Sequence, residues 1–342
     1  MTTQRALVHE SKGVAVVKSD VPLPELPEDY ILVKTKAVAL NPTDWKSLHN
    51  KPVAGAVAGC DYAGIVEKIG SKVTAGLKVG DRVAGFVRGG GVTKRETGAF
   101  AQYINSKGGI QLKLADHVSF EDASTLGVGI TTVGQGLYQS LGLPLPPAKV
   151  EKPTSILIYG ASTATGTLAV QFAKLSGLEV IATSSPHNFD LLKSLGADQV
   201  FDYKDPDVGA KIREATNDEL YYVFDTISEH GSPEISGQAL SSKGGRYAAL
   251  LYATVPRANV HSTVTMGYTV TGEHYNPQWP ANPEDYIFGV KFWKLSEDLI
   301  NSGKIKTHPT EVRSGGLGGI AQGLNDLKDN KVSGVKLVYK IE

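Results

Sequence analysis

The sequence predicts an α/β protein in which a doubly wound parallel sheet is inserted into a barrel-like β domain. Three observations favour this fold class. The first third of the chain contains short β-branched or alternating runs that are separated by Gly, Pro and Asp. From Ser155 onward, apolar runs alternate with segments of helical spacing, as in a parallel sheet. Beyond Gly303 the chain returns to short strand-like runs, which are able to rejoin the first domain.

The β domain is predicted from strand-like runs in the first third of the chain. They cover residues 5–10, 14–18, 30–40, 62–70, 81–87 and 99–104. The pattern changes near residue 120, where residues 119–142 have helical spacing and Ser119 with Asp122 provides a capping signal. Residues 141–154 then form a proline-rich connector.

The inserted domain is predicted from strands that alternate with helices. Strands are expected at residues 155–160, 178–185, 199–203, 221–227 and 244–252, and helices at residues 166–177, 188–196, 208–216 and 232–240. These strands are nearly continuous apolar runs, which indicates that helices cover both faces of the sheet. A last strand is expected within residues 263–273 and a helix at 284–303. We therefore predict a β domain over residues 1–122 and 290–342, and an inserted domain over residues 123–289.

The composition argues against several classes of partner. The formal net charge is +0, so no surface that attracts nucleic acid or an acidic partner is expected. No run of 18 apolar residues occurs, so no membrane span is expected. The single cysteine excludes an intramolecular disulfide and a thiolate-rich metal cage, and it suits the reducing cytoplasm, where we expect the protein.

The stretch YGASTATG (159–166) joins the first strand of the inserted domain to its first helix. At this place a Rossmann fold sets a pyrophosphate against a helix N-terminus. Gly160 and Gly166 suit the tight turn and the close helix packing, whereas residues 162–165 carry hydroxyls in place of a middle glycine. An ordinary strand–helix turn is the alternative, but the surrounding βαβ pattern favours a nucleotide site.

The segment that follows the second strand predicts NADPH in preference to NADH. An NAD site usually has Asp or Glu there for the ribose 2′-hydroxyl. Residues 183–188 contain no acid, and Glu179 lies at the opposite end of the strand. His187 and Lys204 offer positive charge to a 2′-phosphate, although no arginine follows the strand. The same segment also suits a helix cap at Asn188, and the two roles are compatible.

Several stretches resemble the medium-chain dehydrogenase/reductase superfamily. They are ALNPTDWK (39–46), GCDYAGIVEKIGSKV (59–73), VGDRVAG (79–85), GAFAQY (98–103), YGASTATG (159–166) and LLKSLGADQVFDY (191–203). The resemblance implies a GroES-like β-barrel domain that is interrupted by a Rossmann domain, with the active site in the cleft between them.

The single cysteine, Cys60, separates the zinc-dependent from the zinc-free branch of this superfamily. In the zinc alcohol dehydrogenases, the resemblance places a Cys ligand where Asn41 stands here and a His ligand where Cys60 stands. The acid after that His is Glu in those enzymes and Asp61 here. Because a zinc site needs at least three protein ligands, no metal is expected, and Cys60 is expected to be a small packing residue.

Within the zinc-free branch, the chain is most similar to the trans-acting enoyl reductases that serve fungal polyketide synthases. The likeness rests on residues 159–166, 181–203, 244–251 and 332–338. It implies NADPH as hydride donor to the β-carbon of an α,β-unsaturated thioester or ketone, with a polyketide synthase as partner. It also implies a monomer, and the prolines at 277, 280 and 283 argue against edge pairing beyond the last strand.

The resemblance further implies which residues meet the cofactor and the substrate. The expected cofactor residues are Thr43, Asp44, Trp45, Lys46, Ser162, Thr163, Ala164, Thr165, Ser185, Pro186, His187, Asn188, Tyr203, Leu250, Leu251, Ser333 and Gly334. The expected substrate residues are Thr132, Val133, Gly136, Tyr138, Tyr268, Val270 and Gly272. The chain departs from the family pattern at Gly136 and Tyr138, which leaves the size and shape of the substrate open.

Reduction without zinc needs donors around the substrate carbonyl and a proton for the α-carbon. Lys46 is expected to act electrostatically or to orient the cofactor, and Thr132 is expected to face the substrate. Each has a structural alternative, as a surface lysine at a helix start and as a helix-capping or helix-interior threonine. Tyr62 is a further candidate donor, although tyrosines are more often packing residues. The sequence identifies no proton donor, and water stays open.

Two other functions stay open at this point. The chain suits a reductase of free quinones, enones or enals, and turnover of quinones against acyl thioesters separates that function from the first. It also suits a non-catalytic NADPH-binding protein, which would oxidise no NADPH with any enone. The even charge balance argues against RNA as a partner.

Overall fold

A computed structural model of the chain describes residues 3–91 and 94–342. Its internal contacts divide the chain into two compact units. The first unit ends at Val128 and resumes at Tyr268, and the second runs from Gly129 to Gly267. The predicted limits were 122/123 and 289/290, so the later one lies earlier than expected. The reason is that residues after Gly267 pack with the first unit, where the Tyr268 hydroxyl lies 2.5 Å from Thr43 Oγ1.

The first unit is built on a mainly antiparallel sheet, in the order β14–β15–β3–β4–β5–β7, and β6 pairs with β3. The strands are β3 (Tyr30–Ala39), β4 (Asp61–Ile69), β5 (Arg82–Phe86), β6 (Tyr103–Lys107), β7 (Gln111–Lys113), β14 (Thr310–Arg313) and β15 (Lys336–Lys340). β1 (Thr3–Ser11) and β2 (Val14–Pro22) form a separate hairpin. Alternate apolar residues such as Val33 and Val66 enter one core with Tyr62.

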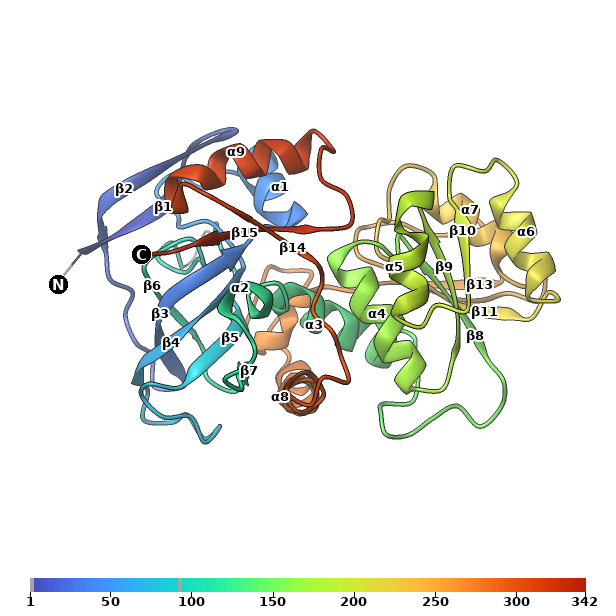
Figure 1. The fold of residues 1–342 in the computed structure, drawn as a ribbon, viewed down its shortest axis with the longest axis horizontal. Helices are drawn as coiled ribbons and strands as arrows, with labels where there is room; N and C mark the ends of the chain where they lie inside the picture. The colour runs from blue at the N-terminus through green and yellow to red at the C-terminus, as the bar shows by residue number, and fades with distance from the viewer. Residues whose placement is uncertain (1–2, 92–93) are drawn as a thin grey trace. The chain divides into compact units, whose positions relative to one another are not determined.

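The end of the chain completes this sheet. β15 pairs antiparallel with β3, so the predicted return of the tail to the first domain is confirmed. The sequence did not predict α9 (Gly316–Lys328), which lies beside α1 (Pro42–Asn50) and is drawn in red in Figure 1. Its glycines weaken the helical pattern. Gly323 is nevertheless needed, because a Cβ there would lie 2.5 Å from the Tyr339 hydroxyl.

The helix predicted over residues 119–142 is a series of shorter helices. They are α2 (Phe120–Ala123), α3 (Gly127–Val133) and the π-helix η1 (Gly134–Ser140). Ser119 caps α2 as predicted, since its Oγ accepts the Asp122 amide at 3.0 Å. In η1, the Leu141 amide donates to the Gly136 carbonyl at 3.0 Å, the wide spacing of a π-helix.

The second unit is a six-stranded parallel sheet in the order β10–β9–β8–β11–β12–β13. The strands are β8 (Ser155–Tyr159), β9 (Glu179–Ser184), β10 (Gln199–Asp202), β11 (Leu220–Asp225), β12 (Gly245–Ala249) and β13 (Val260–Val264). Figure 1 shows α4 (Ala164–Leu175) and α5 (Phe189–Ser194) on one side of this sheet and α6 (Val208–Ala215) and α7 (Ser232–Ala239) on the other. The strand order reverses between β8 and β11, which is the doubly wound arrangement that the sequence predicted.

The core of the second unit explains its apolar strands. Leu157, Ile181, Val223 and Tyr247 come from four neighbouring strands and are fully buried in one cluster. Helices cover both faces of the sheet, so consecutive residues of a strand are buried and no alternation appears in the sequence.

The structure corrects the prediction of a last strand within residues 263–273. β13 lies earlier and pairs with β12 from Val260 to Val264. After the Thr265 amide donates to the Ala249 carbonyl at 2.8 Å, β12 offers no further partner. The chain then forms η3 (Gly267–Thr271), a 3₁₀ turn, and α8 (Pro283–Asn301), which packs against β7 in the first unit. None of the helices in the described parts of the chain combines the length and apolar composition that a membrane crossing requires.

Candidate active site

The turn between β8 and α4 has the form of a phosphate-binding loop. Gly160 has a φ of 72°, and a Cβ there would lie 2.5 Å from the Ile227 side chain. A Cβ on Gly166 would lie 2.5 Å from the Gly160 carbonyl oxygen, so only glycine lets α4 begin this close to the strand. Thr163 caps the helix, because its Oγ1 accepts the Gly166 amide at 2.9 Å.

This turn suits an anion. The first-turn amides of a helix have no intrahelical partners, and the helix dipole favours negative charge at the same end. Ser162, Ala164 and Thr165 lie on the turn at the start of α4, as the sequence predicted. The residues present therefore fit the pyrophosphate of a dinucleotide cofactor.

The other predicted cofactor residues of the second unit follow strands of the same sheet. Ser185, Pro186, His187 and Asn188 follow β9, Tyr203 follows β10, and Leu250 and Leu251 follow β12. The carboxyl ends of parallel strands meet at one edge of the sheet, where doubly wound folds bind ligands. The Gly160 amide donates to Thr183 Oγ1 at 3.0 Å, which ties the phosphate loop to the end of β9.

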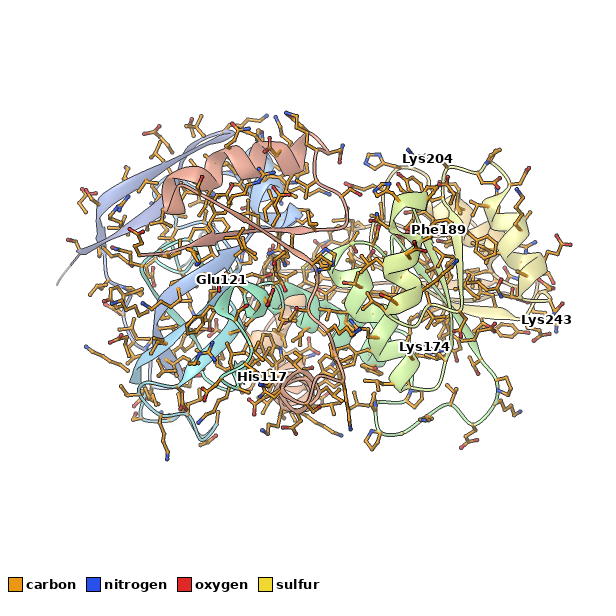
Figure 2. All side chains as sticks on the ribbon, in the orientation of Figure 1. His117, Glu121, Lys174, Phe189, Lys204 and Lys243 are labelled. Atoms are coloured by element: carbon orange, nitrogen blue, oxygen red, sulfur yellow. The ribbon has the colours of Figure 1, made fainter. Side chains whose placement is uncertain are left out.

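The segment that follows β9 contains no acid, whereas the same strand begins with one at the opposite edge of the sheet. Glu179 begins β9 and accepts the Ser155 hydroxyl at 2.6 Å, at the amino end of the sheet. The segment Ser185–Asn188 at the carboxyl end contains no acid. Figure 2 shows Lys204 at this end of the unit and Lys174 toward the other, where Lys174 pairs with Asp198 at 2.7 Å. The segment directly after β9 thus lacks a carboxylate, whereas Asp202 ends the neighbouring strand β10 and Asp225 ends β11 at the same edge.

The sequence reasoning missed Asp225, the last residue of β11. Its carboxylate accepts the Ser232 hydroxyl at 2.5 Å, the Tyr247 hydroxyl at 2.7 Å and the amides of Ile227 and Ser228. Burial raises its pKa despite these bonds. The Ser228 hydroxyl in turn accepts the Leu250 amide at 2.8 Å, so Asp225 fixes the loops after β11 and β12. An acid at the end of an apolar strand was the available signal.

The first unit places residues 43–46 on the first turn of α1. Asn41 is the N-cap, and its amide donates to Asp44 Oδ2 at 2.7 Å in a capping box. Pro42 suits the first helical position because its missing N–H is not needed there. The Lys46 ammonium lies 5.7 Å from the centre of the Trp45 ring. Pro42 and the capping box are thus local signals for the start of this turn.

A buried lysine holds α1 in place. Lys336 Nζ lies 2.5 Å from Asp61 Oδ2, 2.9 Å from Asn41 Oδ1 and 3.1 Å from the Thr125 carbonyl. Lys336 and Asp61 are 4% and 0% exposed, so the pair is shielded from solvent. Asp61 Oδ1 also accepts the Val128 amide at 2.7 Å. Ser333 and Gly334 lie just before Lys336, and the lysine brings their segment to the residues 41–46.

A line of polar groups runs beside this ion pair. Asp44 is buried, and burial raises its pKa to about 7. The Cys60 thiol is within reach of the Asp44 carboxyl, and burial with the nearby Asp44 raises its pKa. Cys60 Sγ lies 3.9 Å from the Tyr268 hydroxyl, which lies 2.5 Å from Thr43 Oγ1. The sequence expected a packing role for Cys60, and the structure adds these two polar neighbours.

Tyr268 also lines a pocket of the first unit. Phe86, Arg88 and Tyr275 share the lining. The Tyr268 and Tyr275 rings are stacked with centroids 5.0 Å apart, and the Arg88 guanidinium lies 3.8 Å from the centre of the Tyr275 ring. These contacts fix the plane of Tyr268, so its hydroxyl is held toward Thr43.

The other predicted substrate residues of the first unit have packing contacts. Val270 is 1% exposed, and a Cβ on Gly289 would lie 2.5 Å from it. Gly272 has a φ of 72°, which explains the glycine. The Tyr62 hydroxyl donates to Gln111 Oε1 at 2.6 Å in the buried core, which gives Tyr62 a packing role.

The second unit holds the remaining predicted substrate residues, and all of them are buried. Thr132 and Val133 lie on α3. A Cβ on Gly136 would lie 2.4 Å from the Phe224 ring. The Tyr138 hydroxyl lies 3.1 Å from Ser176 Oγ. Gly136 and Tyr138 thus have packing contacts within the unit, and their contacts with substrate stay a prediction.

Comparison with known proteins identifies the family. Residues 27–116 match the family described as "Alcohol dehydrogenase GroES-like domain", and residues 164–272 match "Zinc-binding dehydrogenase". Trans-enoyl reductase ACTTS2 of Alternaria alternata is 59% identical over 344 residues, which cover 100% of both chains. The chain belongs to the trans-enoyl reductase family. Trans-enoyl reductase resD of Aspergillus sclerotiorum is 48% identical, over 98% of this chain and 100% of the relative.

Solved structures confirm the fold class of this family member. A putative zinc-dependent alcohol dehydrogenase from Rhizobium etli has a TM-score of 0.82 at 23% identity, over 99% of this chain and 98% of that one. The predicted medium-chain dehydrogenase/reductase fold is therefore confirmed, and the superfamily implies a nicotinamide cofactor, which the β8–α4 turn fits. Among the described residues, no group of three or more His, Cys, Asp and Glu side chains is placed to hold a metal ion.

We predict that Lys336→Met lowers the free energy of unfolding by about 3–5 kcal/mol, because it leaves the Asp61 carboxylate buried without its cation. Denaturant unfolding measures the loss. Lys340→Met is the control, since Lys340 lies on the same strand and pairs with Glu121 at the surface, where a loss of at most about 1 kcal/mol is expected. Equal losses in the two variants would contradict the importance of the buried pair.

We predict that His308 makes the protein less stable as pH falls. Burial and the nearby Lys336 lower the pKa of His308 to about 4, below its ordinary value of 6.5. The unfolded chain therefore takes up the proton first, and the free energy of unfolding declines between about pH 6.5 and pH 4, by about 3 kcal/mol in total. Unfolding of the wild type and of His308→Gln across this range tests it. The slope should weaken in His308→Gln and persist in the exposed control His117→Gln.

Proposed function

We propose that the protein is an NADPH-dependent enoyl reductase that reduces the C=C bond of an α,β-unsaturated thioester. The observation that carries this proposal is the 59% identity to a trans-enoyl reductase over the whole length of both chains. The second unit supports it with a turn suited to a pyrophosphate, and the first unit supports it with buried polar groups at the start of α1.

The cofactor is expected to lie along the carboxyl edge of the second unit's sheet. Ser162, Thr163, Ala164 and Thr165 would hold the pyrophosphate through amides and hydroxyls. Residues 185–188, with Tyr203, would surround the adenosine phosphate. The lack of an acid after β9 favours the 2′-phosphate of NADPH, because a carboxylate there would repel it.

Several further residues are proposed to contact the nicotinamide end of the cofactor. Leu250 and Leu251 would lie by the nicotinamide ribose, and Thr43, Trp45, Ser333 and Gly334 would close the nicotinamide side. When bound, NADPH supplies the hydride that adds to the β-carbon.

Negative charge then develops on the substrate carbonyl oxygen, and this charge must be stabilised. Lys46 is positioned by the Trp45 ring and would supply positive charge near it. Thr132 would supply a hydroxyl, and holding the two reactants in line would contribute further to the rate.

The substrate is proposed to be carried by a partner polyketide synthase, in keeping with the action in trans that the relatives' names describe. We further propose a monomer, because the edge strand β13 is followed by a segment with prolines at 277, 280 and 283. The free, buried Cys60 suits the reducing cytoplasm as the place of action.

The direct test is oxidation of NADPH with short α,β-unsaturated thioesters, a simple enone and a quinone. We expect turnover of thioesters, either free or attached to a carrier protein. Turnover of quinones or free enones alone would show a reductase of small molecules instead. NADPH binding without turnover of any free or carrier-bound substrate would show a binding protein.

Cofactor choice is tested by a charge placed after β9. We predict that Ser185→Asp lowers kcat/KM for NADPH by roughly tenfold or more and leaves kcat/KM for NADH largely unchanged, because the new carboxylate repels a 2′-phosphate. Ser194→Asp is the control, since it adds the same charge on the exposed end of α5. A wild type that uses NADH as well as NADPH would contradict the proposed preference.

A further inference from the structure

We propose that the Tyr268 hydroxyl delivers the proton to the substrate α-carbon and that Cys60 and Asp44 resupply it. This inference rests on the proposed function and assigns the proton donor that the sequence left open. All of the groups belong to the first unit, and they form one continuous line from a buried carboxyl to a pocket.

The Tyr268 side chain connects the pocket with the buried polar groups Cys60 and Asp44. Tyr268 lines the pocket with Phe86 and Tyr275, and its hydroxyl lies near Thr43 and Cys60. That hydroxyl is 2.5 Å from Thr43 Oγ1 and 3.9 Å from Cys60 Sγ, a distance typical of a weak hydrogen bond to sulfur. Thr43 is one of the residues that the resemblance assigns to the cofactor, and Tyr268 is itself one of those that it assigns to the substrate.

Asp44 is placed to return a proton to Cys60 and, through it, to Tyr268. Its Oδ2 accepts the Asn41 amide, whereas its Oδ1 is buried without a conventional hydrogen bond among the described residues. A proton on the Asp44 carboxyl would therefore occupy Oδ1, and the Cys60 thiol is within hydrogen-bonding reach of this carboxyl.

Each proton transfer to the α-carbon and along the three side chains breaks one bond to hydrogen and forms another. After hydride has added to the β-carbon, the electron pair of the enolate forms a C–H bond at the α-carbon with the Tyr268 proton, and the O–H bond breaks. The phenolate takes a proton from the Cys60 thiol, and the thiolate takes one from the Asp44 carboxylic acid. Water then reprotonates Asp44, so each turnover consumes one proton from solvent.

The relative acidities of Asp44, Cys60 and Tyr268 favour proton transfer from Asp44 toward Tyr268. Burial raises the pKa of Asp44 to about 7, and it raises those of Cys60 and Tyr268 well above their usual values. Asp44 is thus the strongest acid of the three, and a phenolate formed at Tyr268 draws its proton. Because Tyr268 stays protonated at neutral pH, it is ready to donate at the start of each turnover.

The surroundings of Asp44 set its pKa and therefore the pH above which it no longer returns a proton to Cys60. Asp61 raises its pKa, and Lys336, the Asn41 amide and Cys60 lower it, while burial is the largest influence. On β2 and α9, which also pack against α1, the charged residues are Lys18, Asp20, Asp326 and Lys328, and Asp326 is paired with Arg313. Above about pH 7 Asp44 is ionised and has no proton to pass on.

The first experiment is Tyr268→Phe in the full chain, assayed with an enoyl thioester and NADPH. We expect kcat to fall by about 10²- to 10⁴-fold, the usual effect of losing a general acid, while the Kd of NADPH and the melting temperature change little. Tyr339→Phe is the matched control, because it removes another buried tyrosine hydroxyl from the same unit and should keep kcat. A kcat within twofold of the wild type in Tyr268→Phe would overturn the proposal.

The second experiment tests the resupply. Wild-type kcat should fall as pH rises through about 7, and Asp44→Asn should lose this inflection and have a low kcat at all pH values. Cys60→Ser keeps a group that passes protons and should retain more activity than Cys60→Ala. An unchanged pH profile in Asp44→Asn, or equal activity in the two Cys60 variants, would overturn the resupply route.

The outcomes separate the two proposals. A wild type that reduces none of the thioesters, free or carrier-bound, overturns the proposed function and this inference with it. Normal turnover by the wild type together with an unaffected Tyr268→Phe variant overturns this inference alone.

Discussion

The buried ion pair between Lys336 and Asp61 is the interaction on which the arrangement of the first unit depends. A charge that is shielded from solvent is costly unless an opposite charge and hydrogen bonds compensate for it. Lys336 meets that requirement with one carboxylate, one side-chain amide oxygen and one backbone carbonyl. These three acceptors come from β4, the cap of α1 and the segment after α2. The final strand of the chain therefore fixes the start of α1.

This ion pair also explains the chemistry of its neighbours. Burial is the main cause of the raised pKa of Asp44; the Asp61 charge raises this pKa further, and the Lys336 charge lowers it. His308, which is also near Lys336, is kept neutral by burial and by the positive charge of that lysine. Asn41 and Asp61 are thus both held by Lys336, a cation from the chain itself.

In the second unit, the main constraint is that the backbone must come close to the phosphates of a cofactor. Gly160 and Gly166 let β8 and α4 come close, and Thr163 uses its hydroxyl to cap the helix without adding bulk. Asp225 then orders the loops after β11 and β12 through bonds to two hydroxyls and two amides. The middle glycine of the usual fingerprint is replaced by small polar residues, and the geometry of the turn is retained.

The sequence by itself determined the features that depend on local composition. The alternation of apolar runs and helical segments after Ser155, the glycines of residues 159–166 and the cap before α1 are each decided by neighbouring residues, and the structure has all of them. Tertiary structure alone decided the rest. The segment 263–273 has a strand-like composition, but β12 ends at Ala249, and Tyr268 finds its partner in Thr43, which is 225 residues away. Lys336 likewise reaches Asp61 across 275 residues. Such contacts have no local signature, because the energy of a buried polar group depends on which distant residues the fold brings to it.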